Sequence, residues 1–282
     1  MWIWTTVASA LFLGLYDVFK KQSLKKNDVL QVLLCTTALS TLLLSPWLSA
    51  GPVEDHLKLF LKAILVSLSW ISGLYGIKLL PLTTASTIKA TRPVFVLVFS
   101  MLLFGERLNA WQWTGSILAI TALYLLSLSS RREGIQFSKS KGILFMAVSV
   151  LAGSASALYD KHIIASMEPL FVQSWCNFYI TLILGVVVLF QWRRQKSAFQ
   201  TFRWDWLLAL IAVLIVVADF LYFYSLKQEG AMLSIISMVR RSSVVVPFLC
   251  GVIFFKEKKV RGKVVALCLL LFAMALLVFG TQ

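Results

Sequence analysis

Four basic side chains lie inside long apolar stretches, where charged residues are rare. Lys89 and Arg92 belong to the run 82–104 and are three residues apart, so they share one face of a helix. Arg240 and Arg241 lie just before the centre of a second such run. A cation at the middle of a membrane-spanning helix costs at least about 2.5–3.5 kcal/mol, so such residues usually have a function. We therefore expect these four residues to form a buried cationic site for an anionic substrate.

The chemistry of these side chains suits either a carboxylate or a phosphate. Arginine presents a planar fork that binds two oxygens at once, and lysine adds a point charge. Asp219 is the carboxylate that we expect at the same depth, because Asp17 and Asp160 come late in their apolar runs, toward opposite membrane faces. Structural pairing within the helix bundle is the alternative role for the cations.

Two tyrosines complete the predicted substrate site. Tyr75, and Tyr222 close to Asp219 in the chain, could direct hydroxyl groups toward a bound anion. Packing or lipid contact is the alternative role for each ring. The predicted substrate-binding residues are Lys89, Arg92, Arg240, Arg241, Tyr75, Asp219 and Tyr222.

The composition shows which elements must position these residues. Hydrophobic residues make up 59% of the 282, and the mean hydropathy is +0.85, which excludes an ordinary soluble domain. The sequence therefore predicts an all-α membrane protein with ten transmembrane helices, each near the roughly 20 residues that one crossing needs. The ten apolar runs are approximately 2–19, 29–49, 59–79, 82–104, 109–128, 142–164, 170–191, 205–226, 231–255 and 262–280.

The net charge of +15 is distributed as membrane topology requires and does not indicate nucleic-acid binding. Most Lys and Arg residues outside the runs lie in the loops that follow odd-numbered runs, including the cluster 256–263, which we expect to be a surface anchor. These loops are predicted to be cytoplasmic, with both termini extracytoplasmic. We expect a multi-pass protein of a bacterial-type cytoplasmic (inner) membrane.

The two halves of the chain repeat each other. The triplet Leu-Tyr-Asp at 15–17 recurs at 158–160, and a second register pairs Lys89 with Arg240. Two units of five helices must be inserted with opposite orientations, as in many secondary transporters. The predicted organisation is a first repeat at 1–130, a cytoplasmic linker at 131–141 and a second repeat at 142–282.

These features resemble the drug/metabolite transporter superfamily, in particular its EamA-type members. The hallmark is the segment 103–108, reading LFGERL, followed by Gln112 and Gly115; a weaker second copy is 254–257 with Gly262. The resemblance implies a ten-helix transporter built from two inverted repeats. Members of the superfamily transport amino acids, drugs, nucleotide sugars and phosphorylated metabolites.

One branch, the triose-phosphate/phosphate translocators, resembles this chain in its basic residues. Lys89 matches that branch's helix-4 lysine, and Arg240 with Arg241 matches its basic pair on helix 9. The chain departs from that pattern by carrying Arg92 and by lacking a histidine in the third helix. The resemblance implies a preference for anions.

The sequence therefore predicts a secondary transporter that moves a small organic anion by alternating access, with a phosphorylated metabolite as the favoured substrate. A flippase for a phosphate-bearing lipid and a general amino-acid or drug metabolite exporter are the alternatives. Exchange of anions and proton coupling through Asp17, Asp160 or Asp219 both remain open. Enzymatic activity, nucleic-acid binding, a metal and a cofactor are not expected, because no paired carboxylates, nucleotide motif or metal-ligand spacing is found. Membrane lipids are the other expected partners.

Overall fold

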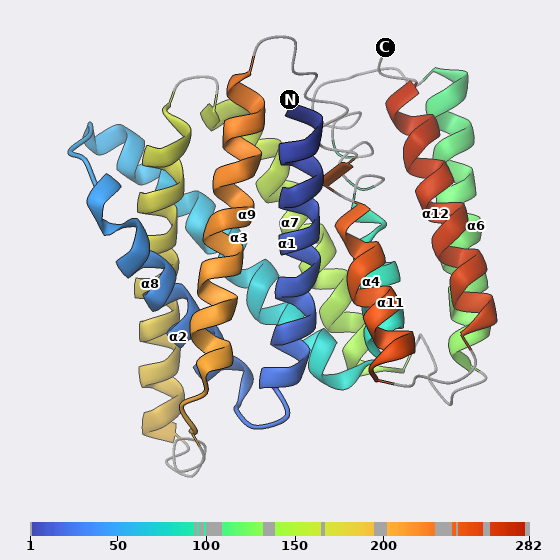
Figure 1. Cartoon of the computed structure of the whole chain (residues 1–282), viewed down its shortest axis with the longest axis horizontal. Helices are drawn as coiled ribbons and strands as arrows, with labels where there is room; N and C mark the ends of the chain where they lie inside the picture. Colours follow the sequence, from blue (N-terminus) through green and yellow to red (C-terminus); the bar gives the residue numbers. More distant parts are fainter. Residues whose placement is uncertain are drawn as a thin grey trace.

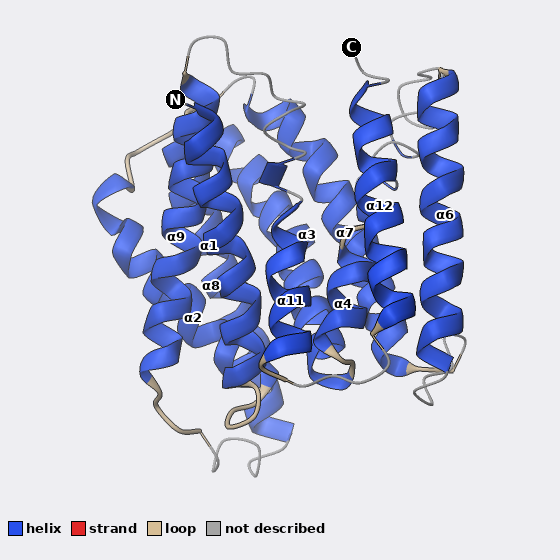
Figure 2. Cartoon of the chain, turned by 45° about the vertical axis from the view of Figure 1, so that its right-hand side comes forward, coloured by secondary structure: helices blue, strands red, loops and turns tan. Residues whose placement is uncertain are grey.

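A computed structural model describes residues 2–92, 95, 99, 109–131, 139–164, 167–194, 202–228, 239–240, 242–255 and 260–279. Over these ranges the chain forms helices and no strand (Figure 2). The α-helices are α1 Trp2–Ser23, α2 Val29–Leu44, α3 Val53–Leu79, α4 Leu82–Lys89, α6 Ala110–Arg131, α7 Lys141–Ile164, α8 Pro169–Arg194, α9 Trp206–Lys227, α11 Val245–Ile253 and α12 Arg261–Phe279, with 3-10 helices η1 Ser45–Trp47 and η3 Ser242–Val244.

The predicted all-α class is confirmed, and each of the ten apolar runs contains one of these helices. Much of the runs 82–104 and 231–255 falls outside the described ranges, so their full lengths stay a prediction. Within the described part, four stretches are long and apolar enough to cross a membrane by length and composition alone: Val29–Trp47, Val53–Leu79, Lys141–Tyr159 and Pro169–Arg193.

Local sequence signals fix the ends of several helices. Pro52 and Pro81 precede α3 and α4 and hold the backbone extended, with ψ of 146° and 144°. Pro169 is the first residue of α8, where a missing backbone N–H removes no helical hydrogen bond. Asp205 caps α9, because its Oδ1 accepts a hydrogen bond of 3.2 Å from the N–H of Leu207.

The helices pair in a pattern that has the symmetry of the sequence repeat. α1 packs along α9 and α3 along α7, whereas α2 packs on α8, α4 on α11 and α6 on α12. In the repeat, α1, α2, α3, α4 and α6 correspond to α7, α8, α9, α11 and α12. Exchanging corresponding helices turns the pair α1–α9 into α7–α3, and the other three pairs stay the same. α1 begins at the end of the molecule where α7 ends, so equivalent helices run in opposite directions (Figure 1). This is the predicted arrangement of two inverted five-helix repeats; the boundaries at 130 and 142 stay a prediction.

Small residues bring α3 and α7 close together. The Ser69 hydroxyl donates to the Ser149 carbonyl at 2.8 Å, and the Ser149 hydroxyl donates back to the Ser69 carbonyl at 2.7 Å. A methyl group added to Gly73 would lie 2.7 Å from the Ser149 Oγ, so only glycine fits at this spacing. The contact is a close helix–helix approach of the kind that small residues permit in membranes.

Gly14 provides the equivalent close approach between α1 and the segment that enters α11. A methyl group added there would lie 2.8 Å from the Ser243 carbonyl oxygen and 2.5 Å from Val246 Cβ. Because the backbone must shift, we expect Gly14→Ala to reduce the free energy of unfolding by about 1–3 kcal/mol. Gly185→Ala is the matched control, since nothing lies within 4 Å of its added methyl. Thermal unfolding of the two purified variants tests this expectation, and equal midpoints would contradict it.

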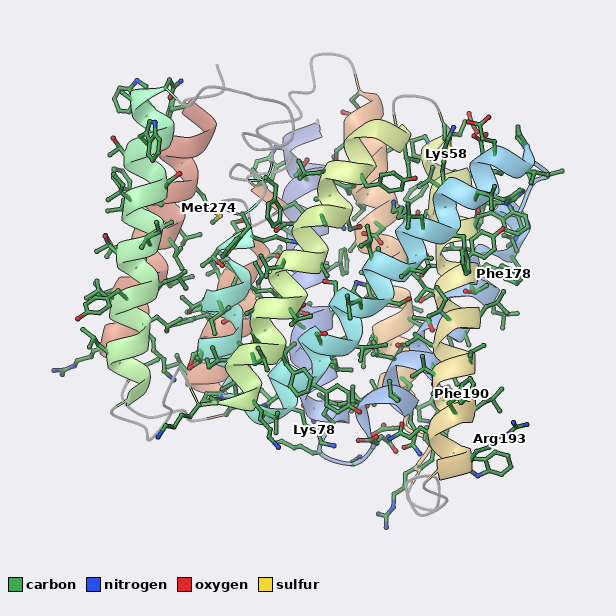
Figure 3. The ribbon with its side chains drawn as sticks, turned by 180° about the vertical axis from the view of Figure 1, so that it is seen from behind. Lys58, Lys78, Phe178, Phe190, Arg193 and Met274 are labelled. Carbon is green, nitrogen blue, oxygen red and sulfur yellow. The ribbon has the colours of Figure 1, made fainter. Side chains whose placement is uncertain are left out.

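The basic connections gather at one end of the molecule. Figure 3 places Lys78 and Arg193 at that end and Lys58 at the opposite end. The Lys21 ammonium donates to the carbonyls of Ile77 and Leu80, where α3 ends. Free carbonyls at a helix C-terminus attract a cation, so Lys21 stabilises this end of α3. The assignment of this end to the cytoplasm stays a prediction.

At the same end, the turn between α1 and α2 is tied to the segment before α9. The Lys26 ammonium donates to Asp205 Oδ2 at 2.8 Å, and Asn27 exchanges two hydrogen bonds with the backbone of Arg203, of 2.9 and 2.8 Å. Lys78 reaches Asp28 at 2.8 Å. The contacts of Lys26 and Asn27 join the two repeats, whereas that of Lys78 lies within the first.

The contact of Asp205 gives stability a pH dependence. The hydrogen bonds from Lys26 and from the Leu207 N–H hold the pKa of Asp205 below its ordinary value. A carboxyl whose pKa is lowered by folding stabilises the protein above its ordinary pKa, and this contribution is lost as the pH falls through the folded pKa. We therefore expect the unfolding midpoint of the wild type to fall more steeply below about pH 5 than that of Asp205→Asn. Parallel midpoint curves in acid would contradict this expectation.

Candidate functional site

Lys89 ends α4 and is bound by a carboxylate of α1. Its ammonium donates to both carboxylate oxygens of Asp17, at 2.7 and 2.6 Å. The Asp17 side chain is 9% exposed, whereas that of Lys89 is 37% exposed. The lysine therefore keeps an accessible side, while its counter-ion is held within the protein.

This pair corrects the expectation that Asp17 lies closer to one membrane face than the basic residues. Asp17 and Lys89 are in direct contact, so the two lie at the same depth. The expectation that Asp219 is the sole carboxylate at this depth is therefore wrong.

Arg240 forms an ion pair with Asp219, which is the contact expected if the cations have a structural role in the helix bundle. The guanidinium Nη2 donates to Asp219 Oδ1, and its Cζ lies 4.1 Å from the centre of the Tyr222 ring. Nη1 is buried and makes no hydrogen bond within the described part of the chain. The site thus brings together three of the predicted residues, and the guanidinium retains donor capacity toward a ligand.

Tyr16 and Lys20 are members of the site that the sequence interpretation missed. Lys20 is 5% exposed, and its ammonium lies 3.9 Å from the centre of the Tyr16 ring and 5.2 Å from that of Trp70. The charges of Asp17 and Lys89 both act on it. Lys20 directly follows the apolar run 2–19, so the sequence alone places it among the loop cations. Its position three residues after Asp17, on the same helical face, was the signal available.

Tyr16 is close to the carboxylates of both ion pairs. The carboxylates of Asp17 and Asp219 both interact electrostatically with its hydroxyl. α1 therefore carries the centre of the site, with α4 supplying Lys89 and α9 supplying Asp219. Three basic side chains (Lys20, Lys89 and Arg240) surround these two carboxylates, so positive charge is in excess.

Arg92 lies against α7. The Ser154 hydroxyl donates to its carbonyl oxygen at 3.3 Å, and its guanidinium occupies the space beside Gly153 that a Cβ would fill. Gly153 is therefore the residue that lets this cation pack against α7. Arg241 falls outside the described residues, and its part in the site stays a prediction.

Tyr75 is placed by a ring contact with α7. It stacks on Phe145, with ring centres 5.3 Å apart and an angle of 25° between the planes. This is the packing role that was the alternative for each ring. Its contribution to substrate binding stays a prediction.

A second buried cation supports α4 at its other end. The Lys263 side chain is fully buried within α12, and its ammonium donates to Thr83 Oγ1 at 2.9 Å. The expectation that the whole cluster 256–263 is a surface anchor is therefore wrong for Lys263. This contact fixes the start of α4, which runs from Leu82 to Lys89.

Comparison with known proteins identifies the family. The sequence model of the EamA-like transporter family matches residues 1–128 and 140–279. The chain belongs to this family. It is therefore a multi-pass membrane transporter of small molecules, and members of the family are transporters rather than enzymes.

The architecture of this EamA-like transporter also occurs in solved structures. One, described only as a crystal structure of a protein, has a TM-score of 0.61 and 16% sequence identity, over 95% of this chain and 96% of that chain. At this identity the likeness concerns the fold alone. No curated protein matches the sequence.

The finer resemblance to triose-phosphate/phosphate translocators stays a prediction for this EamA-like transporter. It rests on Lys89, Arg240 and Arg241, of which the first two each contact a carboxylate in the structure. An anion that bound to Lys89 or Arg240 would meet a carboxylate already in contact with that cation. Such a ligand would either displace Asp17 or Asp219, or share the cation with it.

Proposed function

We propose that this EamA-like transporter carries a small organic anion by alternating access, with phosphorylated metabolites as the favoured class. The observation that carries the proposal is the excess of basic over acidic side chains around Tyr16. Among the described side chains of the site, the three cations Lys20, Lys89 and Arg240 accompany two carboxylates, those of Asp17 and Asp219, so an added anion improves the charge balance. Buried charges are otherwise costly in a membrane.

The donor chemistry supports a ligand with several oxygens. Arg240 has a buried Nη1 that no described residue engages, and the Lys89 side chain is partly accessible. A guanidinium and an ammonium together can bind different oxygens of one phosphate or carboxylate. Such charge-assisted hydrogen bonds are each worth about 1.5–3 kcal/mol.

The helix pairing supports alternating access. α1 packs with α9 and α11, and α7, its counterpart in the inverted repeat, packs with α3 and α4. Lys89 belongs to one group and Asp17 to the other, so their ion pair bridges the two. Motion of one group against the other would open this contact, as expected for a carrier with its site between inverted repeats.

Amino-acid transport is the second candidate, because the site presents both charges. A zwitterion could place its carboxylate on Lys89 and its ammonium on Asp17. Asp17→Asn separates the two candidates, since it removes the partner of the ammonium but leaves the cations that bind an anion. A lipid flippase remains the alternative in which the same cations bind a phosphate headgroup.

Thermal unfolding of the purified protein with added ligands tests the proposal. Three-carbon phosphate esters, dicarboxylates, amino acids and short-chain phospholipids are compared at equal ionic strength. A ligand of the native state at a hundredfold excess over its Kd adds about 2.7 kcal/mol to the free energy of unfolding. We expect the phosphate esters to give the largest shift. Stabilisation by phospholipids alone would favour flipping, and stabilisation by quaternary ammonium compounds would overturn the proposal.

We further propose a bacterial-type cytoplasmic membrane, with the end that carries Lys78 and Arg193 in the cytoplasm. The gathering of basic residues at this end supports this orientation (Figure 3). Cysteines introduced at Lys58 and Lys78 test it in intact cells. An impermeant thiol reagent should modify the first and spare the second, and the reverse pattern would invert the assignment.

A further inference from the structure

The two carboxylates of the site occupy the cations that the proposed substrate would bind. Asp17 accepts two hydrogen bonds from Lys89, and Asp219 accepts one from Arg240. The carboxylates come from α1 and α9, which pack along each other, and both act on Tyr16. In the absence of substrate, each of these two cations therefore already has an anion in contact.

We propose that Asp17 and Asp219 act as built-in counter-anions that let the empty carrier reorient, so that transport is net and not obligatory exchange. The inference rests on the proposed anion transport and assigns its mode. The sequence alone had left exchange open, because exchange avoids moving uncompensated charges through the membrane.

The physical reason is the cost of unpaired charge at the centre of the protein. A carrier whose cations lose their only counter-ion on substrate release must move bare charge through a region of low dielectric constant, at several kcal/mol per ion. Here Asp17 also interacts with Lys20, which additionally lies over the rings of Tyr16 and Trp70. Substrate release therefore leaves Lys89 and Arg240 each paired with a carboxylate of the protein itself.

The same arrangement sets a competition between carboxylate and substrate. An anion that displaces Asp17 from Lys89 binds with an apparent Kd equal to the intrinsic Kd divided by the fraction of sites that the carboxylate leaves free. We expect Asp17→Asn to bind inorganic phosphate more tightly, by about tenfold if the carboxylate holds roughly nine-tenths of the sites. The tighter binding would accompany a loss of net transport.

Uptake of radiolabelled inorganic phosphate into proteoliposomes measures both modes. One set of vesicles contains no phosphate and the other contains unlabelled phosphate, with the membrane potential clamped by an ionophore. The wild type should take up label in both sets. In Asp17→Asn and in Asp219→Asn the ratio of net to exchange flux should fall by about tenfold or more, because the empty carrier then holds an uncompensated charge.

Two controls separate this role from a structural one. Asp17→Glu keeps the charge and should keep the wild-type ratio, and Asp28→Asn removes a carboxylate that pairs with Lys78 at the end of the molecule. A merely structural ion pair would lower both fluxes together and leave the ratio unchanged, which would overturn the inference. Wild-type flux that requires internal phosphate would overturn it as well. Absence of phosphate flux in both modes, with no thermal shift by phosphate esters, would instead overturn the proposed function.

Discussion

Lys89→Ala should remove most of the affinity for an anion. The ammonium supplies charge-assisted hydrogen bonds worth about 1.5–3 kcal/mol each, so loss of one raises the Kd about 10- to 150-fold. The substitution also leaves the Asp17 carboxylate, which is 9% exposed, without the Lys89 ammonium that pairs with it. The stabilisation by phosphate esters in thermal unfolding should therefore fall to the level of added salt.

A loss of folding could imitate this result, and two variants exclude that explanation. Asp17→Asn combined with Lys89→Gln replaces the ion pair by two neutral side chains that can still hydrogen-bond. This double variant should unfold near the wild-type midpoint but should not respond to anions. Lys78→Ala removes a lysine paired with Asp28 at the basic end and should bind anions as the wild type does. Full anion stabilisation of the double variant would exclude Lys89 from the site.

Gly153→Ala should impair transport with little loss of stability. The added methyl group would occupy the position of the Arg92 guanidinium, which is the far end of a flexible side chain and can move away. Repacking keeps the stability cost near the low end of the 1–3 kcal/mol typical of overpacking. We expect anion uptake to fall about tenfold, because the methyl group displaces the Arg92 guanidinium from α7 by a distance larger than the positional tolerance of a binding site.

Gly185→Ala is again the matched control, since its methyl group meets open space in α8. Proteoliposome uptake and thermal unfolding should both remain at wild-type values for this variant. If Gly153→Ala transports normally, the place of Arg92 in the substrate site is excluded. If its unfolding midpoint is several degrees lower than that of the wild type, the packing around Gly153 is tighter than the contact with the flexible Arg92 side chain implies.

The fold could be predicted from the sequence because its signals are physical and repetitive. Apolar runs of membrane-spanning length, separated by proline and charged turns, indicated the helices that the structure contains. Pro52 and Pro169 lie between apolar runs of the sequence, and in the structure they stand immediately before α3 and at the first position of α8. The inverted repeat followed from the odd number of helices in each half.

The composition of the site was only partly predictable, because depth was judged along single apolar runs. Lys89 lies about two helical turns after the start of α4 at Leu82, and Asp17 about two turns before the end of α1 at Ser23. Both helix ends lie at the basic end of the molecule, so the two side chains meet. Because the first apolar run ends at 19, whereas α1 continues to Ser23, the sequence placed Asp17 too close to a membrane face.

The aromatic residues show the same limit in another way. The sequence predicts that Tyr222 directs its hydroxyl group toward a bound anion, and in the structure its ring lies against the Arg240 guanidinium. Tyr75 stacks on Phe145, a contact between α3 and α7 that depends on tertiary packing. Spacing within one helix predicts which residues share a face, but not which neighbouring helix that face meets.

The buried ammonium of Lys263 has a practical consequence. Acylating reagents attack lysines from solvent, and this amine is shielded on all sides while it donates to Thr83. Lys25 and Lys26, both exposed, serve as internal references in the same digest. The rate at which Lys263 becomes acylated therefore reports how often α12 and the start of α4 separate, and so measures this movement of the transporter.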